Sequence, residues 1–208
     1  EFLLAVNFFL KLGQERLRHN AEKEQLLIEL SAKNVSDAKL KYLVAHDELT
    51  GLFNRSNFER RLKLALNRGR NLHKNAALLF IEVDRFCLIN EMKGFDVGDR
   101  LLVELAVLMR KLAPANSLFA RVGVNEFCLF LEDKSKTQAQ KYAETFKNTV
   151  ENHRFHFDEA KHTVTLSIGL STLDDAVSTE HPGKIILYAR QACVLGKRCG
   201  GDKIGVYS

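Results

Sequence analysis

The chain has 208 residues, of which 46% are hydrophobic and 27% charged, and its formal net charge is +5 at pH 7. This length accommodates one well-buried domain with an appendage, and the composition is typical of an ordinary globular protein rather than a disordered or low-complexity chain. The basic excess is spread along the chain. We interpret it as a solvated surface, with a nucleic-acid partner as the alternative.

The cysteines and the apolar start of the chain exclude several classes of protein. Cys87, Cys128, Cys193 and Cys199 form no CxxC pair, so we expect free thiols in a reducing cytoplasm rather than a zinc site or a disulfide framework. No apolar run reaches the roughly 18 residues that a membrane-spanning helix needs. Residues 2–10 are apolar except for Asn7, but they lack the basic start of a signal peptide. We expect them to be an apolar helix end that associates with other apolar surfaces, or the continuation of a membrane segment.

The first 45 residues predict a long helix. Between Phe2 and Val44 there is no proline, and Gly13 is the only glycine. A heptad spacing gives a seam that is apolar at both ends of this stretch and polar in its middle. Two interpretations remain open: a coiled coil that pairs two chains, or a single helix packed on its own domain.

The next part of the chain predicts a buried strand between helices. Gly51 suits a turn, and Asn54 is placed to cap the helix that follows. Residues 76–84 are almost all apolar, as in a central strand covered on both faces. The helix after this strand must bend within residues 93–99, because two glycines fall within five residues there.

The second half of the chain continues the alternation of strands and helices. We predict a hairpin at 117–131, a helix at 134–154, a strand at 163–170, a helix at 183–195 and a short strand at 203–207. Strands interleaved with helices predict an α/β sandwich.

The acidic residues at the end of the first strand and in the hairpin turn form the predicted site. Glu82 and Asp84 end the strand, and Asn125 and Glu126 lie in the turn. We expect these side chains to meet. If the protein binds a metal ion or a nucleotide phosphate, we expect it to bind there.

Three segments resemble, in the right order, the signatures of the GGDEF family, the diguanylate cyclases that condense two GTP into cyclic di-GMP. They are Asp47–Arg55, Asp84–Glu91 followed by Gly94, Gly98 and Asp99, and Arg121–Phe127. The resemblance implies the palm-like fold of nucleotidyl cyclases, a central sheet containing antiparallel strands and flanked by helices. It also implies two parts, an N-terminal signalling helix (1–45) and a degenerate GGDEF domain (46–208).

The central motif departs from the family pattern, because it reads Gly-Val-Asn-Glu-Phe. The two metal-holding positions of the family correspond to Glu82 and Asn125, and a neutral amide is a poor ligand for Mg²⁺. Val124 replaces a glycine, and its branched side chain restricts the turn and fills space. The resemblance therefore implies no catalytic residues, Glu82 as the remaining candidate metal ligand, and a vestigial site made of Glu82, Asp84, Val124, Asn125 and Glu126.

Nucleotide contacts are better preserved than the metal ligands. Asn90 and Asp99 match the positions that read the guanine edge in the family, whereas two family cations are replaced by Cys87 and Gly201. The implied nucleotide-binding residues are Phe86, Asn90, Asp99 and Lys197. Either weak guanine-nucleotide binding survives, or Asn90 and Asp99 only cap or pair locally.

The resemblance makes a catalytically inactive regulatory domain the leading hypothesis. It implies a homodimer through the N-terminal helix, an upstream sensor and a linked EAL domain. The location would be cytoplasmic, including the cytoplasmic part of an inner-membrane protein. No cofactor is required, although Mg²⁺ and GTP are ligands to test. Residues 114–117 lack the Arg-x-x-Asp of the family's inhibitory site, so no such site is expected.

Two alternatives remain. One is a slow or altered diguanylate cyclase that uses Glu82, Asp84 and Glu126 for metal. The other is an adaptor in RNA turnover, which the pI of about 9.0 motivates; RNA is the partner that the sequence supports least.

Overall fold

The computed structural model describes residues 23–25, 39–71, 75–157, 160–174, 183–198 and 201–207. The chain divides into two compact units, Glu1–Val44 and Ala45–Ser208. In the first unit, residues 23–25 and 39–44 are helical, in agreement with the prediction. The remainder of the predicted helix, including most of the heptad seam, lies outside the described residues. None of the described helices is both long and apolar enough to cross a bilayer.

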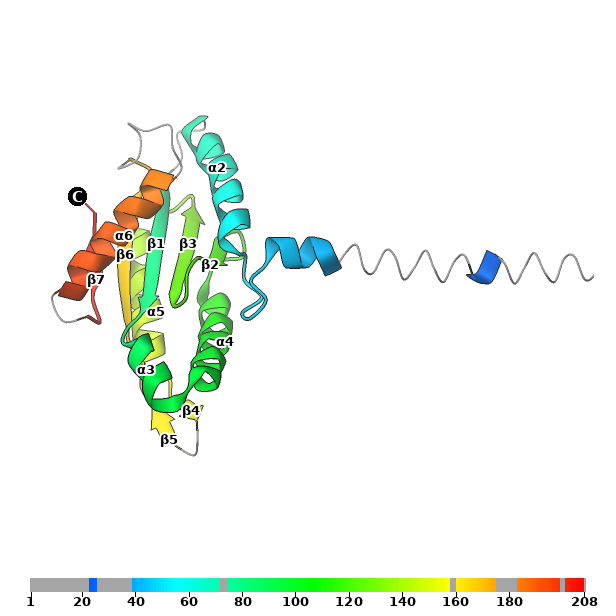
Figure 1. Ribbon diagram of the computed structural model, residues 1–208. Helices are drawn as coiled ribbons and strands as arrows, with labels where there is room; N and C mark the ends of the chain where they lie inside the picture. Colours follow the sequence, from blue (N-terminus) through cyan, green and yellow to red (C-terminus); the bar gives the residue numbers. More distant parts are fainter. Residues whose placement is uncertain are drawn as a thin grey trace, which may run out of the picture. The chain divides into compact units, whose positions relative to one another are not determined.

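The second unit is a mixed sheet with helices on both faces (Figure 1). The elements are α2 (Arg55–Asn71), β1 (Ala76–Val83), α3 (Phe86–Lys93), α4 (Phe95–Leu112), β2 (Leu118–Arg121), β3 (Glu126–Glu132), α5 (Lys136–Asn152), β4 (Phe155–Phe157), β5 (Ala160–His162), β6 (Leu166–Thr172), α6 (Gly183–Arg198) and β7 (Ile204–Val206). The sheet order is β2-β3-β1-β6-β7, and β4 and β5 form a separate ribbon. β1 is antiparallel to both neighbours, whereas β7 is parallel to β6. The predicted fold is confirmed, and only the small β4–β5 ribbon was not predicted.

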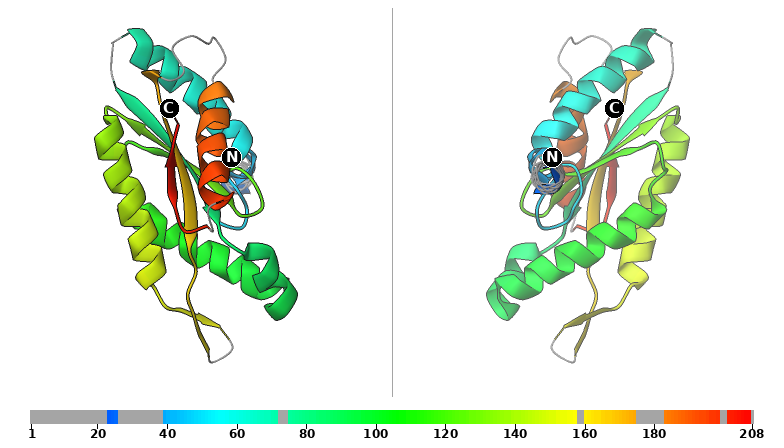
Figure 2. Two further views of the ribbon diagram at one scale, coloured as in Figure 1. Left: turned by 90° about the vertical axis from the view of Figure 1, so that its left-hand side faces the viewer. Right: turned by 90° about the vertical axis from the view of Figure 1, so that its right-hand side faces the viewer.

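The side chains of β1 alternate between two apolar layers. Leu79 and Ile81 pack with α4 and α5, whereas Leu78 and Phe80 pack with α2 and α6. Figure 2 shows these two pairs of helices on opposite sides of the sheet. Glu82 is the only residue of β1 that is not buried. By the same alternation it faces the layer that contains α6.

The break between α3 and α4 is narrower than the sequence predicts. Gly94 interrupts the helix, with a φ of 88°, but Gly98 lies buried inside α4. A methyl group at position 98 would overlap Asn90 Oδ1 of α3. The second glycine therefore allows α3 and α4 to pack closely and does not form a turn.

Two predicted boundaries also move. β6 begins at Leu166 rather than at residue 163, and α6 continues to Arg198 rather than ending at residue 195. The apolar periodicity of α6 stops before the helix does, because its last turn carries Lys197 and Arg198. Cations are favourable at a helix C-terminus, where the helix dipole is negative.

The contact between β6 and α6 can be tested at Gly169. A methyl group at this position would overlap the backbone carbonyl oxygen of Ala189 and the backbone nitrogen of Cys193. These backbone atoms cannot rotate away, so we expect Gly169→Ala to lower the free energy of unfolding by about 1–3 kcal/mol in urea denaturation. Gly183→Ala is the matched control, because the space around Gly183 is open, and it should leave the protein equally or slightly more stable. Equal effects of the two substitutions would contradict the close packing.

Candidate functional site

Two carboxylates lie opposite each other at the end of the β1–β3 ladder. Glu82 and Glu126 are cross-strand neighbours, so the strand end and the hairpin meet as the sequence predicts. Like charges in directly opposite positions repel each other. The even-numbered neighbours on both strands pack with α2 and α6, so both carboxylates face the same layer.

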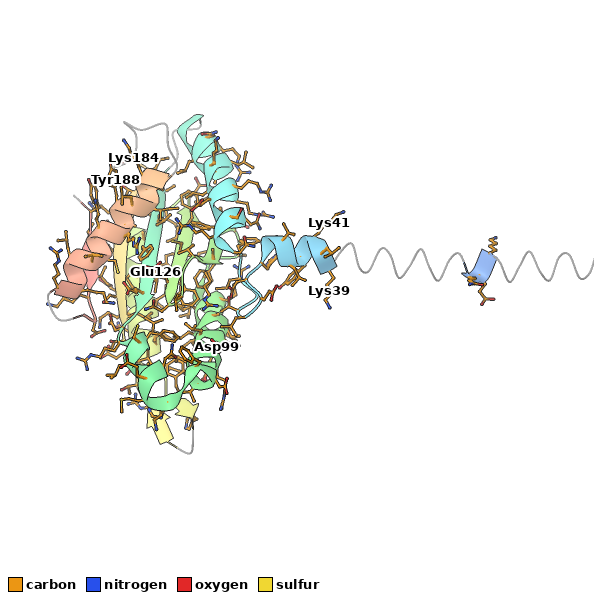
Figure 3. The ribbon with its side chains drawn as sticks, in the orientation of Figure 1. Lys39, Lys41, Asp99, Glu126, Lys184 and Tyr188 are labelled. Carbon is orange, nitrogen blue, oxygen red and sulfur yellow. The ribbon has the colours of Figure 1, made fainter. Side chains whose placement is uncertain are left out.

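Two cations of α6 neutralise these carboxylates. Lys197 Nζ lies 2.8 Å from Glu82 Oε1, and Arg190 Nη2 lies 3.0 Å from Glu126 Oε1. The cations are seven residues apart in the chain, about two helical turns, and therefore share one face of α6. Glu126 is labelled in Figure 3. The family resemblance identifies Lys197 but not Arg190. The seven-residue spacing between the two cations is the sequence signal that could have identified Arg190.

Lys197 keeps its proton at neutral pH. Partial burial alone would lower the pKa of its ammonium group, but the hydrogen bond to Glu82 and the charges of Glu82 and Asp84 raise that pKa above its ordinary value. Lys197 Nζ also lies 3.9 Å from Asp84 Oδ1. A fixed positive charge therefore lies among the acidic side chains.

Asp84 does not meet the hairpin turn, so this expectation was wrong. Its carboxylate accepts hydrogen bonds from Thr165 Oγ1 at 2.8 Å, Ser167 Oγ at 2.7 Å and the backbone nitrogen of Asp202 at 2.9 Å. The ladder with β3 ends at Glu82, whereas the ladder with β6 continues one residue further. Asp84 therefore turns toward β6. Only 8% of its surface is exposed, and the three donors compensate for its lost hydration.

Asn125 is bound to the backbone of β1. Its side-chain Nδ2 donates to the Val83 carbonyl oxygen at 2.8 Å, and its backbone carbonyl oxygen accepts from the Val83 nitrogen at 3.0 Å. A carboxylate at position 125 has no proton for the first of these bonds. Val124 is 68% exposed at the tip of the hairpin. Its carbonyl oxygen accepts a hydrogen bond from Arg121 Nη2 at 2.8 Å.

The donor set at this end of the sheet does not fit a divalent cation as it stands. Mg²⁺ needs several oxygen ligands in near-octahedral geometry. Glu82 and Glu126 are paired with cations, Asp84 accepts three hydrogen bonds, and Asn125 directs an N–H group at the strand. In the described parts of the chain, no three His, Cys, Asp or Glu side chains are arranged to hold a metal ion.

The residues matched to guanine recognition lie on α3 and α4. Phe86 is the buried residue of α3. Asn90 Oδ1 is buried and has no hydrogen-bond partner among the described residues. Asp99 is exposed on α4 (Figure 3). Neither the Asn90 nor the Asp99 side chain forms a hydrogen bond or ion pair within the described ranges. Asp99 is open to solvent, whereas the Asn90 oxygen lies buried against Gly98 of α4.

Asp47 and Arg121 connect the turn before α2 to the hairpin. Asp47 Oδ1 accepts hydrogen bonds from the nitrogen and Oγ1 of Thr50, at 2.9 and 2.7 Å, and lies 3.2 Å from Arg121 Nη1. Burial alone would raise the pKa of Asp47, but the Thr50 hydrogen bonds and the Arg121 charge hold it below its ordinary value. This segment therefore supports the hairpin.

The described cysteines are free thiols, and residues 114–117 carry no charged side chain. Cys128 and Cys193 are buried free thiols, and Cys87 is exposed. Burial raises the pKa of Cys193 to about 12, so its thiol is protonated and unreactive at neutral pH. Ser117 Oγ donates to the Pro114 carbonyl oxygen at 2.6 Å, which forms a turn without charged side chains. Cys199 lies outside the described residues.

Comparison with known proteins decides the family. A family model described as "Diguanylate cyclase, GGDEF domain" matches residues 44–203. The chain belongs to the GGDEF domain family. The probable diguanylate cyclase DgcE of Escherichia coli is 34% identical over 169 residues, which is 81% of this chain and 15% of DgcE. Four curated relatives are matched over only 15–32% of their own length.

Solved structures of other GGDEF domains have the same fold as this GGDEF domain. The FimX GGDEF domain from Pseudomonas aeruginosa has a TM-score of 0.72 and 29% identity, over 77% of this chain and 98% of that one. The coiled coil and GGDEF domain of DgcB from Caulobacter crescentus, in complex with c-di-GMP, has a TM-score of 0.81 over 90% of this chain and 98% of that one. At 18% identity, the DgcB likeness shows the fold alone.

The pairing of Asp47 with Arg121 predicts a pH dependence of stability. Asp47→Asn should destabilise this GGDEF domain by about 1 kcal/mol near neutral pH, after allowance for solvent screening. Because the folded-state pKa is lowered, the stabilisation is complete above the unfolded-state pKa of about 4 and is lost as the pH falls through the folded-state pKa. Urea denaturation of both proteins at a series of pH values should show their difference shrinking in acid.

Asp174→Asn is the control for this prediction. Asp174 is exposed, and its side chain has no partner within the described ranges, so this variant should differ little from the wild type at any pH. A constant difference between the wild type and Asp47→Asn down to the acid limit would show that the carboxylate charge is not the cause.

Proposed function

We propose that this chain is a GGDEF domain that does not synthesise cyclic di-GMP and instead acts as a regulatory module in cyclic di-GMP signalling. One observation carries the proposal: the polar groups at the end of β1 and in the hairpin are engaged with protein partners. Lys197 and Arg190 neutralise the two glutamates, and Asn125 donates to the strand. The names of the matched relatives support the signalling family rather than this particular activity.

The chemistry of cyclisation explains why this arrangement supports an inactive domain. Joining two nucleoside triphosphates places large negative charge on the departing pyrophosphate, which cyclases of this kind neutralise with metal ions and cations. Here the charge of Lys197 is balanced by Glu82, and the matched positions Cys87 and Gly201 carry no charge. The site therefore lacks both the ligands for metal and the free cations.

We propose that weak GTP binding survives without catalysis. Asn90 Oδ1 is buried without a partner among the described residues, and a guanine N–H group is a donor that would satisfy it. Asp99 is exposed on the next helix and offers a second acceptor. Because these contacts involve the base, we expect them not to require Mg²⁺. Phe86 and Lys197 complete the proposed nucleotide-binding set.

The proposal extends to the whole protein. We propose a homodimer formed through the N-terminal helix, which would transmit a signal from an upstream sensor to a linked EAL domain. The DgcB structure combines a coiled coil with a GGDEF domain, and the matched relatives are much longer than this chain; both facts support a multidomain arrangement. We propose a cytoplasmic domain, either free or belonging to an inner-membrane protein.

Calorimetric titration with GTP, with and without Mg²⁺, tests the nucleotide proposal, together with a chromatographic assay for cyclic di-GMP. We expect weak binding that Mg²⁺ changes by less than about twofold, and no product. Asn90→Ala and Asp99→Asn should each weaken binding about tenfold, which corresponds to one lost hydrogen bond in a buried site. Asp174→Asn is the control. Formation of cyclic di-GMP would contradict the inactive assignment, and absence of binding would leave a purely structural coupling module.

Asn125→Asp tests whether the asparagine at this position prevents metal binding beside Glu82 and Glu126. The new carboxylate cannot donate to the Val83 carbonyl oxygen and adds charge beside Glu82 and Glu126. We expect a loss of about 1–3 kcal/mol in the free energy of unfolding, whereas Asn116→Asp in an exposed turn should cost less. Millimolar Mg²⁺ should not restore the stability of Asn125→Asp, and the double variant with Val124→Gly should make no cyclic di-GMP. Rescue by Mg²⁺ or product formation would favour the slow cyclase instead.

A further inference from the structure

A hollow lies beside α3 on a face other than the one that carries Phe86 and Asn90. Its volume is about 650 Å³, within the range of roughly 300–1,000 Å³ for pockets that hold small organic molecules. The walls come from α3, the start of α4, the segment that leads into β6, the end of α6 and the turn after it. Figure 1 shows α3 and the β4–β5 ribbon at the same end of the sheet.

One face of α3 forms the longest wall of this hollow. The lining residues of this wall are Arg85, Leu88, Ile89, Met92 and Lys93. Leu88, Ile89, Met92 and Lys93 share one face of the helix, and Arg85 is the residue immediately before it, with a φ of 54°. Phe86 and Asn90 project from a different face and are not among the described residues that line the hollow. The hollow is therefore distinct from the proposed base-reading site.

The interior of the hollow is apolar and open to ligands. Leu88 is 47% exposed and Met92 is 70% exposed, which leaves two large apolar side chains in contact with solvent in a concave surface. Val97, Leu101 and Val164 also line the hollow, but these side chains are almost fully buried. Exposed apolar side chains that gather in a concavity are typical of a binding site, whereas isolated ones are not.

The charge around the hollow that lacks a partner is positive. Arg85 and Lys93 are exposed, and neither side chain forms an ion pair or hydrogen bond in the described part of the chain. Their α-carbons are eight residues apart, which corresponds to about 12 Å along a helix, so one cation lies at each end of the apolar side chains. The other charged lining residues have partners: Lys197 pairs with Glu82 at 2.8 Å, Asp202 Oδ2 with Lys147 at 2.9 Å, and Asp84 with its three donors. The second oxygen of Asp202, Oδ1, is buried without a hydrogen-bond partner among the described residues.

We propose that the hollow between α3 and the segment leading into β6 binds a small organic anion with an apolar body, such as an aromatic or acyl sulfonate, phosphate or carboxylate. The apolar body packs against Leu88, Met92 and Val164, and the anionic group meets Arg85 or Lys93. The concavity favours a small molecule over a protein segment. The proposal requires neither Asn90 nor Asp99, although Lys197 of the proposed nucleotide-binding set also lines the hollow.

A matched pair of probes tests both halves of this proposal. Naphthalene-2-sulfonate and 2-naphthol share the same aromatic body and differ in charge. In calorimetric titration of the wild-type chain we expect the sulfonate to bind with a dissociation constant of about 0.01–1 mM and 2-naphthol to bind about tenfold more weakly, the effect of one charge-assisted contact. Absence of sulfonate binding up to about 1 mM would overturn the proposal. Equal binding of the two probes would overturn the anion requirement.

Substitutions locate the site. Met92→Glu and Lys93→Glu should each reduce sulfonate binding at least tenfold, because each places a negative charge at the hollow. Val107→Glu and Lys111→Glu are the controls, since both residues are exposed on α4 and neither lines the hollow. Urea denaturation would verify that all four variants fold. Unchanged sulfonate binding in Met92→Glu and Lys93→Glu would overturn the assignment of the site.

Two further readouts separate this proposal from its rivals. Titration with GTP should give the same result for Met92→Glu as for the wild type, so that failure of the nucleotide proposal and failure of this one remain distinguishable. Sedimentation should show the same oligomeric state for both proteins. A change of oligomeric state in Met92→Glu would mean that a second copy of the chain covers the hollow and would overturn the small-molecule assignment.

Discussion

Strand β1 is buried on both faces and paired at both edges. This arrangement determines where polar side chains can lie in the domain. A strand in this position has apolar side chains along its length, and polar groups collect at its end. The alternation of side chains then directs Glu82 toward α6, while Asp84, one residue beyond the strand, turns to β6. The pairing of β1 with β3 and β6 determines the direction in which each acidic side chain points, and no ligand is needed to explain it.

The charges at this end are compensated within the protein. Glu82 and Glu126 are adjacent carboxylates, and two cations on one face of α6 compensate for their repulsion. Asn125 adds a hydrogen bond to the strand where a carboxylate would add a third charge. The same substitutions that make the site a poor metal site therefore make it a stable part of the fold.

Helix α3 lies between the two proposed ligand sites. It buries only Phe86 and packs against α4, where Gly98 allows Asn90 to approach closely. One of its faces carries Asn90 beside α4, and another forms the wall of the hollow near β6. A short helix with so little burial has few contacts that fix its position. Occupancy on either face would act on the same element.

Apart from the β4–β5 ribbon, the sequence by itself determined the order of strands and helices, the family motifs and the loss of the motif carboxylate at Asn125. These depend on local periodicity and on residue identity. Only the tertiary structure decided the partners. Lys197 pairs with Glu82 across 115 residues, and the Asp202 nitrogen reaches Asp84 across 118. Sequence periodicity shows on which face of a helix or strand a side chain lies, but it does not show which distant segment packs against that face. For this reason Arg190, the donors to Asp84 and the hollow beside α3 became visible only when distant segments were brought together.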